Sequence, residues 1–108
     1  MREKRNIQLQ HLRTSVVLER IIWDAITDIA VYEGVSLYQF CQLVDQRRLT
    51  TSLTAALRVV VVIYLRHLTQ QQTTQYQKHH LGAPQEAPAP VKQLPTVLQA
   101  FQDAEARG

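Results

Sequence analysis

The spacing of hydrophobic residues changes in the first third of the chain. Residues 12–18 alternate with a period of two, which predicts a short β-strand. One side of this strand carries Arg13, Ser15 and Val17, and the other side carries Thr14, Val16 and Leu18. Beyond Glu19 the period lengthens to about 3.6. The resulting apolar stripe, flanked by Trp23, consists of Ile22, Ile26, Ile29 and Ala30. The pattern therefore predicts a strand followed directly by a helix.

A second helix is predicted after Gly34, because glycine suits the left-handed position that ends a helix. Ser36 and Gln39 match a capping box, in which each side chain binds the backbone N–H of the other residue. The face that this helix buries is formed by Leu37, Phe40, Cys41 and Val44. Arg47 and Arg48 suit its C-terminal end, since cations are favoured there.

Residues 53–68 predict a third helix, because their apolar positions share one broad face. The β-branched run over residues 59–63 leaves a buried strand as the alternative. Residues 12–68 form the expected folded domain. We expect residues 1–11 to be a basic flexible arm, and residues 69–108 a tail rich in Gln, Pro and Ala with a short helix over 95–106.

Composition narrows the classes of function. The chain has 108 residues and a net charge of +3, with the basic residues Arg2, Lys4 and Arg5 near its start, which suits contact with phosphate. It shows no nucleotide-binding motif and no catalytic arrangement, so we expect neither an enzyme nor a cofactor. His79 and His80 could bind a metal weakly, but a solvated polar tail is the simpler interpretation, and no metal site is expected.

Two further features bear on where the chain acts. Cys41 is the only cysteine, so no intramolecular disulfide can form, which fits the cytoplasm. The most apolar run, over residues 59–65, is too short to span a bilayer, which needs about 20 residues. We therefore expect no membrane partner.

The order of strand, helix, glycine and capped helix resembles the ribbon-helix-helix superfamily of the Arc repressor type. Residues 13–19 read RTSVVLE, as in a bacterial group with the pattern Arg-Thr-Ser-Val-x-Leu-Glu. Trp23, the GVSL step over residues 34–37 and the TAALR segment over residues 54–58 fit the same group. The resemblance implies a mostly helical fold with an added third helix. It also implies a homodimer in which the strands of two chains pair antiparallel.

The resemblance implies double-stranded DNA as the partner, with the paired strands in the major groove. The side chains expected to contact bases are Arg13, Ser15 and Val17. Proteins that bind DNA through a β-ribbon usually have a polar residue at the position of Val17. The groups expected to contact phosphate are the free N–H groups of Ser36, Leu37 and Tyr38 together with Arg2, Lys4 and Arg5. The residues expected in the core or dimer interface are Thr14, Val16, Leu18, Trp23, Ile26, Phe40 and Val44. The alternative for Arg13, Ser15 and Val17 is a solvent-facing or dimer-edge strand that contacts no bases.

The sequence leaves two functional hypotheses. In the first, the protein is a dimeric transcriptional repressor or autoregulator that occludes an operator, with two or more dimers side by side where half-sites repeat. In the second, the dimer is a protein-interaction module, similar to an antitoxin, whose tail binds a protein partner. We expect deletion of residues 84–108 to separate them, leaving DNA binding intact in the first case.

Overall fold

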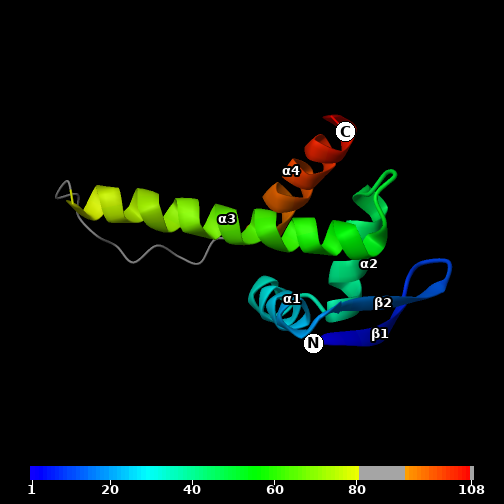
Figure 1. Ribbon diagram of the computed structural model, residues 1–108. Helices are drawn as coiled ribbons and strands as arrows, with labels where there is room; N and C mark the ends of the chain where they lie inside the picture. Colours follow the sequence, from blue (N-terminus) through cyan, green and yellow to red (C-terminus); the bar gives the residue numbers. More distant parts are fainter. Residues whose placement is uncertain (81–91, 108) are drawn as a thin grey trace.

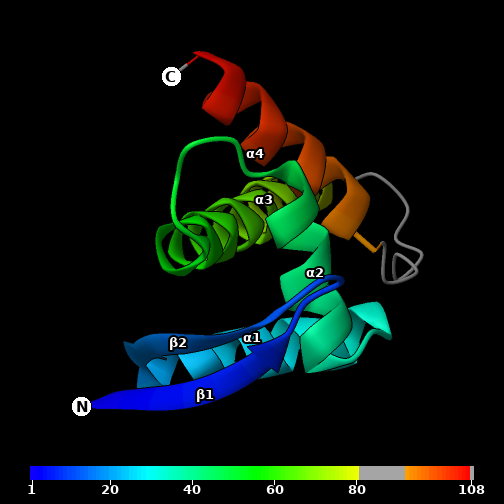
Figure 2. The same ribbon diagram turned by 90° about the vertical axis from the view of Figure 1, so that its right-hand side faces the viewer.

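The computed structural model describes residues 1–80 and 92–107, with only the helical backbone described for 71–80. Two strands precede four helices (Figure 1). Their bounds are β1 Arg2–Gln8, β2 Arg13–Glu19, α1 Arg20–Glu33, α2 Leu37–Arg47, α3 Leu53–His80 and α4 Leu94–Arg107. The hairpin of β1 and β2 lies at one side of the molecule, α1 and α2 lie against it, and α3 and α4 follow beyond them (Figure 2).

Strands β1 and β2 pair antiparallel within one chain, with Arg2 opposite Glu19 and Gln8 opposite Arg13. The turn is short: the backbone N–H of Leu9 donates to the carbonyl oxygen of Leu12 at 2.8 Å. The expected flexible arm over residues 1–11 is therefore corrected to a β-strand and its turn. The expectation that β2 pairs only with a second chain also needs correction, because β1 of the same chain occupies one edge of β2.

Strand β1 is held by one buried side chain of α1. The Trp23 indole N–H donates a 2.8 Å hydrogen bond to the carbonyl oxygen of Glu3, and the Arg5 guanidinium lies 4.8 Å from the centre of the Trp23 ring. Nearer the turn, Ile7 and Leu9 are buried in the core. The inner face of β1 thus packs through Glu3, Arg5 and Ile7, with Leu9 following in the turn, and this tertiary packing orders the segment.

The first two helices follow the sequence pattern. Gly34 has a φ of 75°, and the N–H of Val35 donates to the carbonyl oxygen of Ala30 at 3.0 Å, so the chain leaves α1 through a left-handed glycine. At α2, Gln39 N–H donates to Ser36 Oγ at 3.0 Å and Ser36 N–H donates to Gln39 Oε1 at 2.8 Å. This capping box and the helix-rich architecture after the ribbon confirm the expected fold class.

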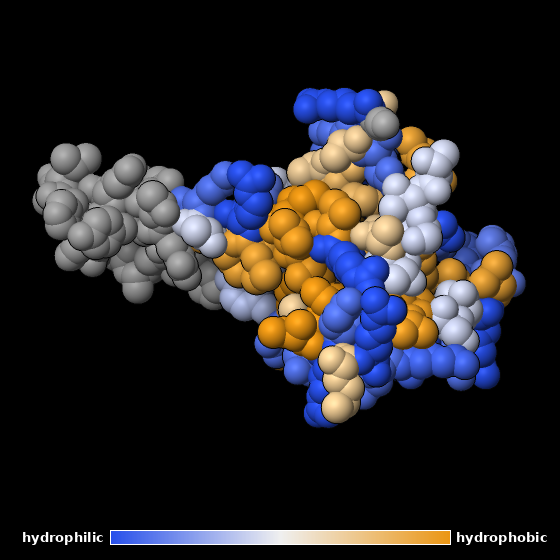
Figure 3. Space-filling view, in the orientation of Figure 1, coloured by the Kyte–Doolittle hydropathy of each residue, from blue (hydrophilic) through white to orange (hydrophobic). Residues whose placement is uncertain are grey.

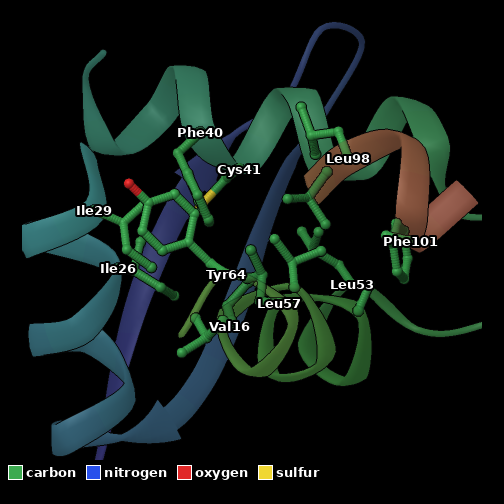
Figure 4. Close-up of a cluster of buried hydrophobic side chains, with 14 of the residues drawn as sticks. Val16, Ile26, Ile29, Phe40, Cys41, Leu53, Leu57, Tyr64, Leu98 and Phe101 are labelled. Atoms are coloured by element: carbon green, nitrogen blue, oxygen red, sulfur yellow. The ribbon is translucent and has the colours of Figure 1, made fainter. Parts of the chain in front are cut away.

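The third helix packs within its own chain, against α1, α2, α4 and β2. Residues 53–68, for which a buried strand was the alternative, are helical. The hydrophobic core lies where these elements meet (Figure 4). Of the expected core residues, six are buried and Thr14 is half-buried; the six are Val16, Leu18, Trp23, Ile26, Phe40 and Val44.

Helix α4 completes the core from the C-terminal part of the chain. Its buried side chains are Leu94, Val97, Leu98 and Phe101, and they pack on α2 and α3. The tail helix expected over residues 95–106 corresponds to this element. Residues 81–91, which contain the expected proline-spaced linker, lie outside the described residues.

One stretch of α3, Leu53–Gln70, is long and apolar enough by length and composition to cross a membrane. A single such helix is weak evidence, because the core helix of a soluble protein passes the same test. In this chain Leu57, Val60 and Tyr64 from that stretch are buried in the core.

Candidate nucleic-acid interface

The hairpin presents one continuous solvent-exposed face, which we call the outer ribbon face. Because side chains alternate along a strand, every second residue of β1 and β2 points away from the helices. The residues of this face, all exposed, are Arg2, Lys4, Asn6 and Gln8 from β1 and Arg13, Ser15 and Val17 from β2. The strand register sets them in cross-strand pairs: Lys4 opposite Val17, Asn6 opposite Ser15, and Gln8 opposite Arg13.

The outer ribbon face is rich in groups that hydrogen-bond to base edges. Arginine and lysine suit the guanine edge, and asparagine and glutamine suit the adenine edge. Two of these side chains already contact each other, since Ser15 Oγ donates to Asn6 Oδ1 at 3.0 Å. The face therefore offers cationic, amide, hydroxyl and methyl groups side by side on two strands.

Sequence reasoning placed Arg13, Ser15 and Val17 on one face, and the structure brings them together there. It overlooked Asn6 and Gln8, which were included in the flexible arm. The signal that could have revealed them is the alternation in which Ile7 and Leu9 fall between polar residues. The charged residues Glu3 and Arg5 on the inner side of β1 obscured that alternation.

Two of the three expected phosphate-binding cations of the arm lie on the outer ribbon face, and one does not. Arg2 and Lys4 are exposed there. Arg5 belongs to the inner face, where it lies over Trp23 and its guanidinium is 2.8 Å from Glu3 Oε2. The role of Arg5 is thus corrected: it fixes β1 on α1 rather than extending freely toward a ligand.

Glu19 closes the ribbon at the end where α1 begins. Arg58 of α3 donates to both of its carboxylate oxygens, at 2.9 and 3.1 Å. A hydrogen bond with its own backbone, together with Arg58, holds the pKa of Glu19 below its usual range. The carboxylate therefore stays ionised and paired, and it ties α3 to the end of β2.

The start of α2 supplies a second cluster of donors. Figure 2 shows α2 rising from the level of the hairpin toward α3, and Gln42 of α2 donates to the Gln8 carbonyl oxygen at 3.3 Å. The expected anion site included the N–H of Ser36, but that group donates to Gln39 Oε1. The N–H groups of Leu37 and Tyr38 have no acceptor within the helix, because the first residues of a helix lack one.

Among the described residues, no group of three or more His, Cys, Asp and Glu side chains could hold a metal ion. Cys41 is fully buried, and burial raises the pKa of its thiol to about 12, so the thiol is protonated at neutral pH.

A two-stranded ribbon with polar side chains on its free face, followed by two helices, is the arrangement of a ribbon-helix-helix domain. The model of the ribbon-helix-helix domain family matches residues 2–65, which is more than half of the chain. The chain therefore belongs to the ribbon-helix-helix family. Domains of this family generally bind DNA as dimers and are typically regulators rather than enzymes. No curated protein and no solved structure matches the chain.

Proposed function

We propose that this protein is a sequence-specific DNA-binding repressor or autoregulator of the bacterial cytoplasm, and that it inserts the outer ribbon face into the major groove. The observation that carries the proposal is the face itself: seven exposed side chains on two strands, six of them polar. A major groove about 12 Å wide admits a two-stranded ribbon. The RTSVVLE strand and the family match support the same assignment.

Roles within the interface follow from side-chain chemistry. Arg13 is able to donate two hydrogen bonds to a guanine edge, and Val17 offers a methyl contact to thymine. Arg2 and Lys4 lie at the end of the ribbon farthest from the turn and suit phosphate contact. The free N–H groups of Leu37 and Tyr38 at the start of α2 would bind a flanking phosphate, since a helix N-terminus attracts anions.

An apolar surface away from the outer ribbon face supports the proposal that two copies of the chain form a dimer. Hydrophobic residues gather along α3 in Figure 3. We call this the α1–α3 patch: the exposed side chains of Tyr32, Val59, Val62 and Leu65. Val62 is 55% exposed and Leu65 48% exposed. A hollow of about 290 Å³ beside them is lined by Ala25, Asp28, Ile29, Tyr32, Tyr64, Leu65 and Leu68. Dimerisation here would cover apolar area and leave both hairpins free.

In the interaction-module hypothesis the Gln-rich, Pro-spaced tail binds a partner, and its Pro-spaced segment over residues 82–90 lies outside the described residues. The apolar residues at the end of the tail, Val97, Leu98 and Phe101, are buried against α2 and α3 of the same chain. No observation on the described residues favours the tail as a binding segment, so DNA binding is the single function that we propose.

The test is a titration of the full chain with labelled double-stranded DNA at several salt concentrations. We expect affinity to fall steeply with salt, because each phosphate contact releases condensed counterions. A specific operator fragment, found by selection from random sequence, should bind at least about 1000-fold more tightly than unrelated DNA. Equal affinity for all DNA, or none for any, would contradict the proposal.

A further inference from the structure

Strand β2 has one edge whose backbone groups bond to no other described residue. Strand β1 occupies the opposite edge, and the backbone hydrogen bonds from Leu9 to Leu12 and from Arg20 to Met1 frame the ladder between the two strands. Because hydrogen-bonded and non-hydrogen-bonded pairs alternate in an antiparallel ladder, every second residue of β2 turns its N–H and C=O groups away from β1. Such an edge is a template for a further strand. Its residues are Arg13, Ser15 and Val17.

Open space borders the same edge of β2. A hollow of about 410 Å³ is lined by Thr14, Ser15 and Val16 of β2 and by residues of α2 and of the start of α3. Leu12, which directly precedes β2, is 56% exposed, although the alternation puts it on the inner side of the strand with Val16. The helices of the same chain therefore leave room for a strand at this edge, and they leave an apolar side chain beside it uncovered.

The occupant that fits this edge is β2 of a second copy, since domains of this family generally bind DNA as dimers. With Ser15 on a twofold axis, the free groups of Arg13 meet those of the partner's Val17, and each such pair exchanges two hydrogen bonds. In the same register Leu12 lies opposite the partner's Leu18, which covers it. The edge shares no residue with the α1–α3 patch, so the two contacts involve different surfaces. The dimer ribbon then has four strands, with β1 at both outer edges.

The width of four strands gives β1 a separate role. A major groove is about 12 Å wide and admits two strands. Neighbouring strands lie about 4.8 Å apart, so the axes of the two outer strands would be about 14 Å apart, which is wider than the groove. We infer that β2 of both copies enters the groove, and that β1 lies over the groove walls, where Lys4 and Asn6 bind the sugar-phosphate backbone. The inference rests on the proposed DNA-binding function and divides the outer ribbon face between base contact and backbone contact.

The side chain of Asn6 is oriented for a phosphate. Ser15 Oγ donates to Asn6 Oδ1 at 3.0 Å, so the amide oxygen is engaged within the hairpin and both amide N–H groups are left to donate. A phosphate oxygen only accepts hydrogen bonds, which matches these donors. Lys4, on the same exposed face of β1, adds a positive charge. Ser15 thus positions Asn6 from the strand that reads bases, and Asn6 contacts the backbone beside it.

The role of β1 is tested by selecting bound double-stranded oligonucleotides from a random pool and then measuring affinities. The full chain is compared with Asn6→Ala, Ser15→Ala and, as a control in the exposed turn, Gln10→Ala. We expect a wild-type core with dyad symmetry, in which Ser15→Ala relaxes two positions related by the dyad. Asn6→Ala should leave every base preference unchanged and weaken binding to all sequences roughly 2- to 12-fold for each hydrogen bond lost. Gln10→Ala should change neither property.

The pairing of β2 is tested by a disulfide at the twofold axis. Directly opposite residues of a hydrogen-bonded antiparallel pair have Cα atoms about 5.5 Å apart, which a disulfide can bridge. Oxidation of Ser15→Cys with DNA present should therefore yield a covalent dimer on a non-reducing gel. Gln10→Cys has no copy of itself opposite and should stay monomeric, and Cys41 is buried.

Failure of the inference differs from failure of the proposed function. Altered base preferences in Asn6→Ala would place β1 in the groove, and no disulfide in Ser15→Cys would exclude the four-stranded ribbon; either result overturns the inference while DNA binding stands. If the wild-type chain selects no sequence, the proposed function fails and the inference fails with it. Where thermal unfolding shows that Asn6→Ala does not fold, Asn6→Asp replaces it, and its carboxylate should weaken binding further because phosphate repels it.

Discussion

The Tyr64 hydroxyl of α3 donates a 2.7 Å hydrogen bond to Oε2 of Glu33, the last residue of α1. Glu33 is only 5% exposed, and its carboxylate also accepts the backbone N–H groups of Gln93 and Leu94, each at 3.0 Å. Leu94 begins α4, so the carboxylate lies at the positive end of that helix. One buried side chain thus joins α1, α3 and α4.

Replacing this carboxylate should loosen the C-terminal helix. We expect Glu33→Gln to lower the free energy of unfolding by about 1–3 kcal/mol, because an amide NH₂ would face backbone donors that now bind a charged acceptor. Urea denaturation followed by circular dichroism measures the change. Asp28→Asn, an exposed substitution on the same helix, is the control and should stay within about 0.5 kcal/mol of wild type. Equal stabilities for the two variants would show that the Glu33 contacts contribute nothing.

Alkaline pH should weaken the same junction. Burial and the hydrogen bond to Glu33 raise the pKa of Tyr64 above its ordinary value of about 10. A tyrosine whose pKa is raised by folding contributes its full stabilisation below pH 10 and loses it progressively above, because only the unfolded chain ionises there. The stability difference between wild type and Tyr64→Phe should therefore shrink as the pH rises from 9 to 11. A constant difference over that range would contradict the assignment, and exposed Tyr38→Phe is the control.

Cys41 should be inert in the folded protein. Its thiol is inaccessible and has a raised pKa of about 12, so the reactive thiolate is almost absent at pH 8. We expect iodoacetamide to modify the native chain only through unfolding, and to modify it fully in guanidinium chloride, as mass spectrometry would show. Rapid modification under native conditions would mean that α2 does not pack as described.

Removal of α4 should destabilise the domain and not merely delete a tail. Four buried side chains leave the core with it, each worth about 1.5–3 kcal/mol, and their sum is comparable to the whole stability of a small domain. Deletion of residues 84–108 is therefore expected to unfold the domain, and no longer to leave DNA binding intact. The milder variant Phe101→Ala should cost about 3–5 kcal/mol in denaturant unfolding, against almost nothing for exposed Gln102→Ala. A truncated chain with wild-type stability would overturn this account.

Substitutions of three basic residues of the ribbon, Arg13, Lys4 and Arg5, should have different effects on DNA binding and stability. Arg13→Ala should cost about 1–3 kcal/mol of operator binding and relax one base preference, whereas Lys4→Ala should weaken binding to all sequences and reduce the salt slope by about one. Arg5→Ala should instead lower stability by about 0.5–2 kcal/mol through loss of its contact with Trp23. Fluorescence anisotropy and thermal unfolding separate the three. Uniform weakening by Arg13→Ala would make it a phosphate contact.

The sequence predicted the elements whose signals are local. Ile26 and Ile29 recur at helical spacing, Gly34 ends α1, and Ser36 with Gln39 begins α2; each of these depends on residues within a few positions of one another. Alternation over residues 12–18 likewise gave β2 and the face that Arg13 and Ser15 share.

Strand β1 escaped prediction because its cause is distant in the sequence. Two of its inward residues, Glu3 and Arg5, are charged and are held by Trp23, about 20 positions away. The docking of α4 depends on Glu33, which lies about 60 residues before that helix. No local sequence pattern therefore predicts how α4 docks. The contribution of Asn6 and Gln8 to the outer ribbon face was missed for the same reason as β1.

Gln10 and His11 are all that separates the hydrogen-bonded residues Leu9 and Leu12. A hairpin with so short a turn forms in microseconds, at a rate that does not depend on protein concentration. Dilution separates subunits, yet it cannot open a hairpin whose halves are covalently joined. A single molecule would therefore carry the complete outer ribbon face at any protein concentration.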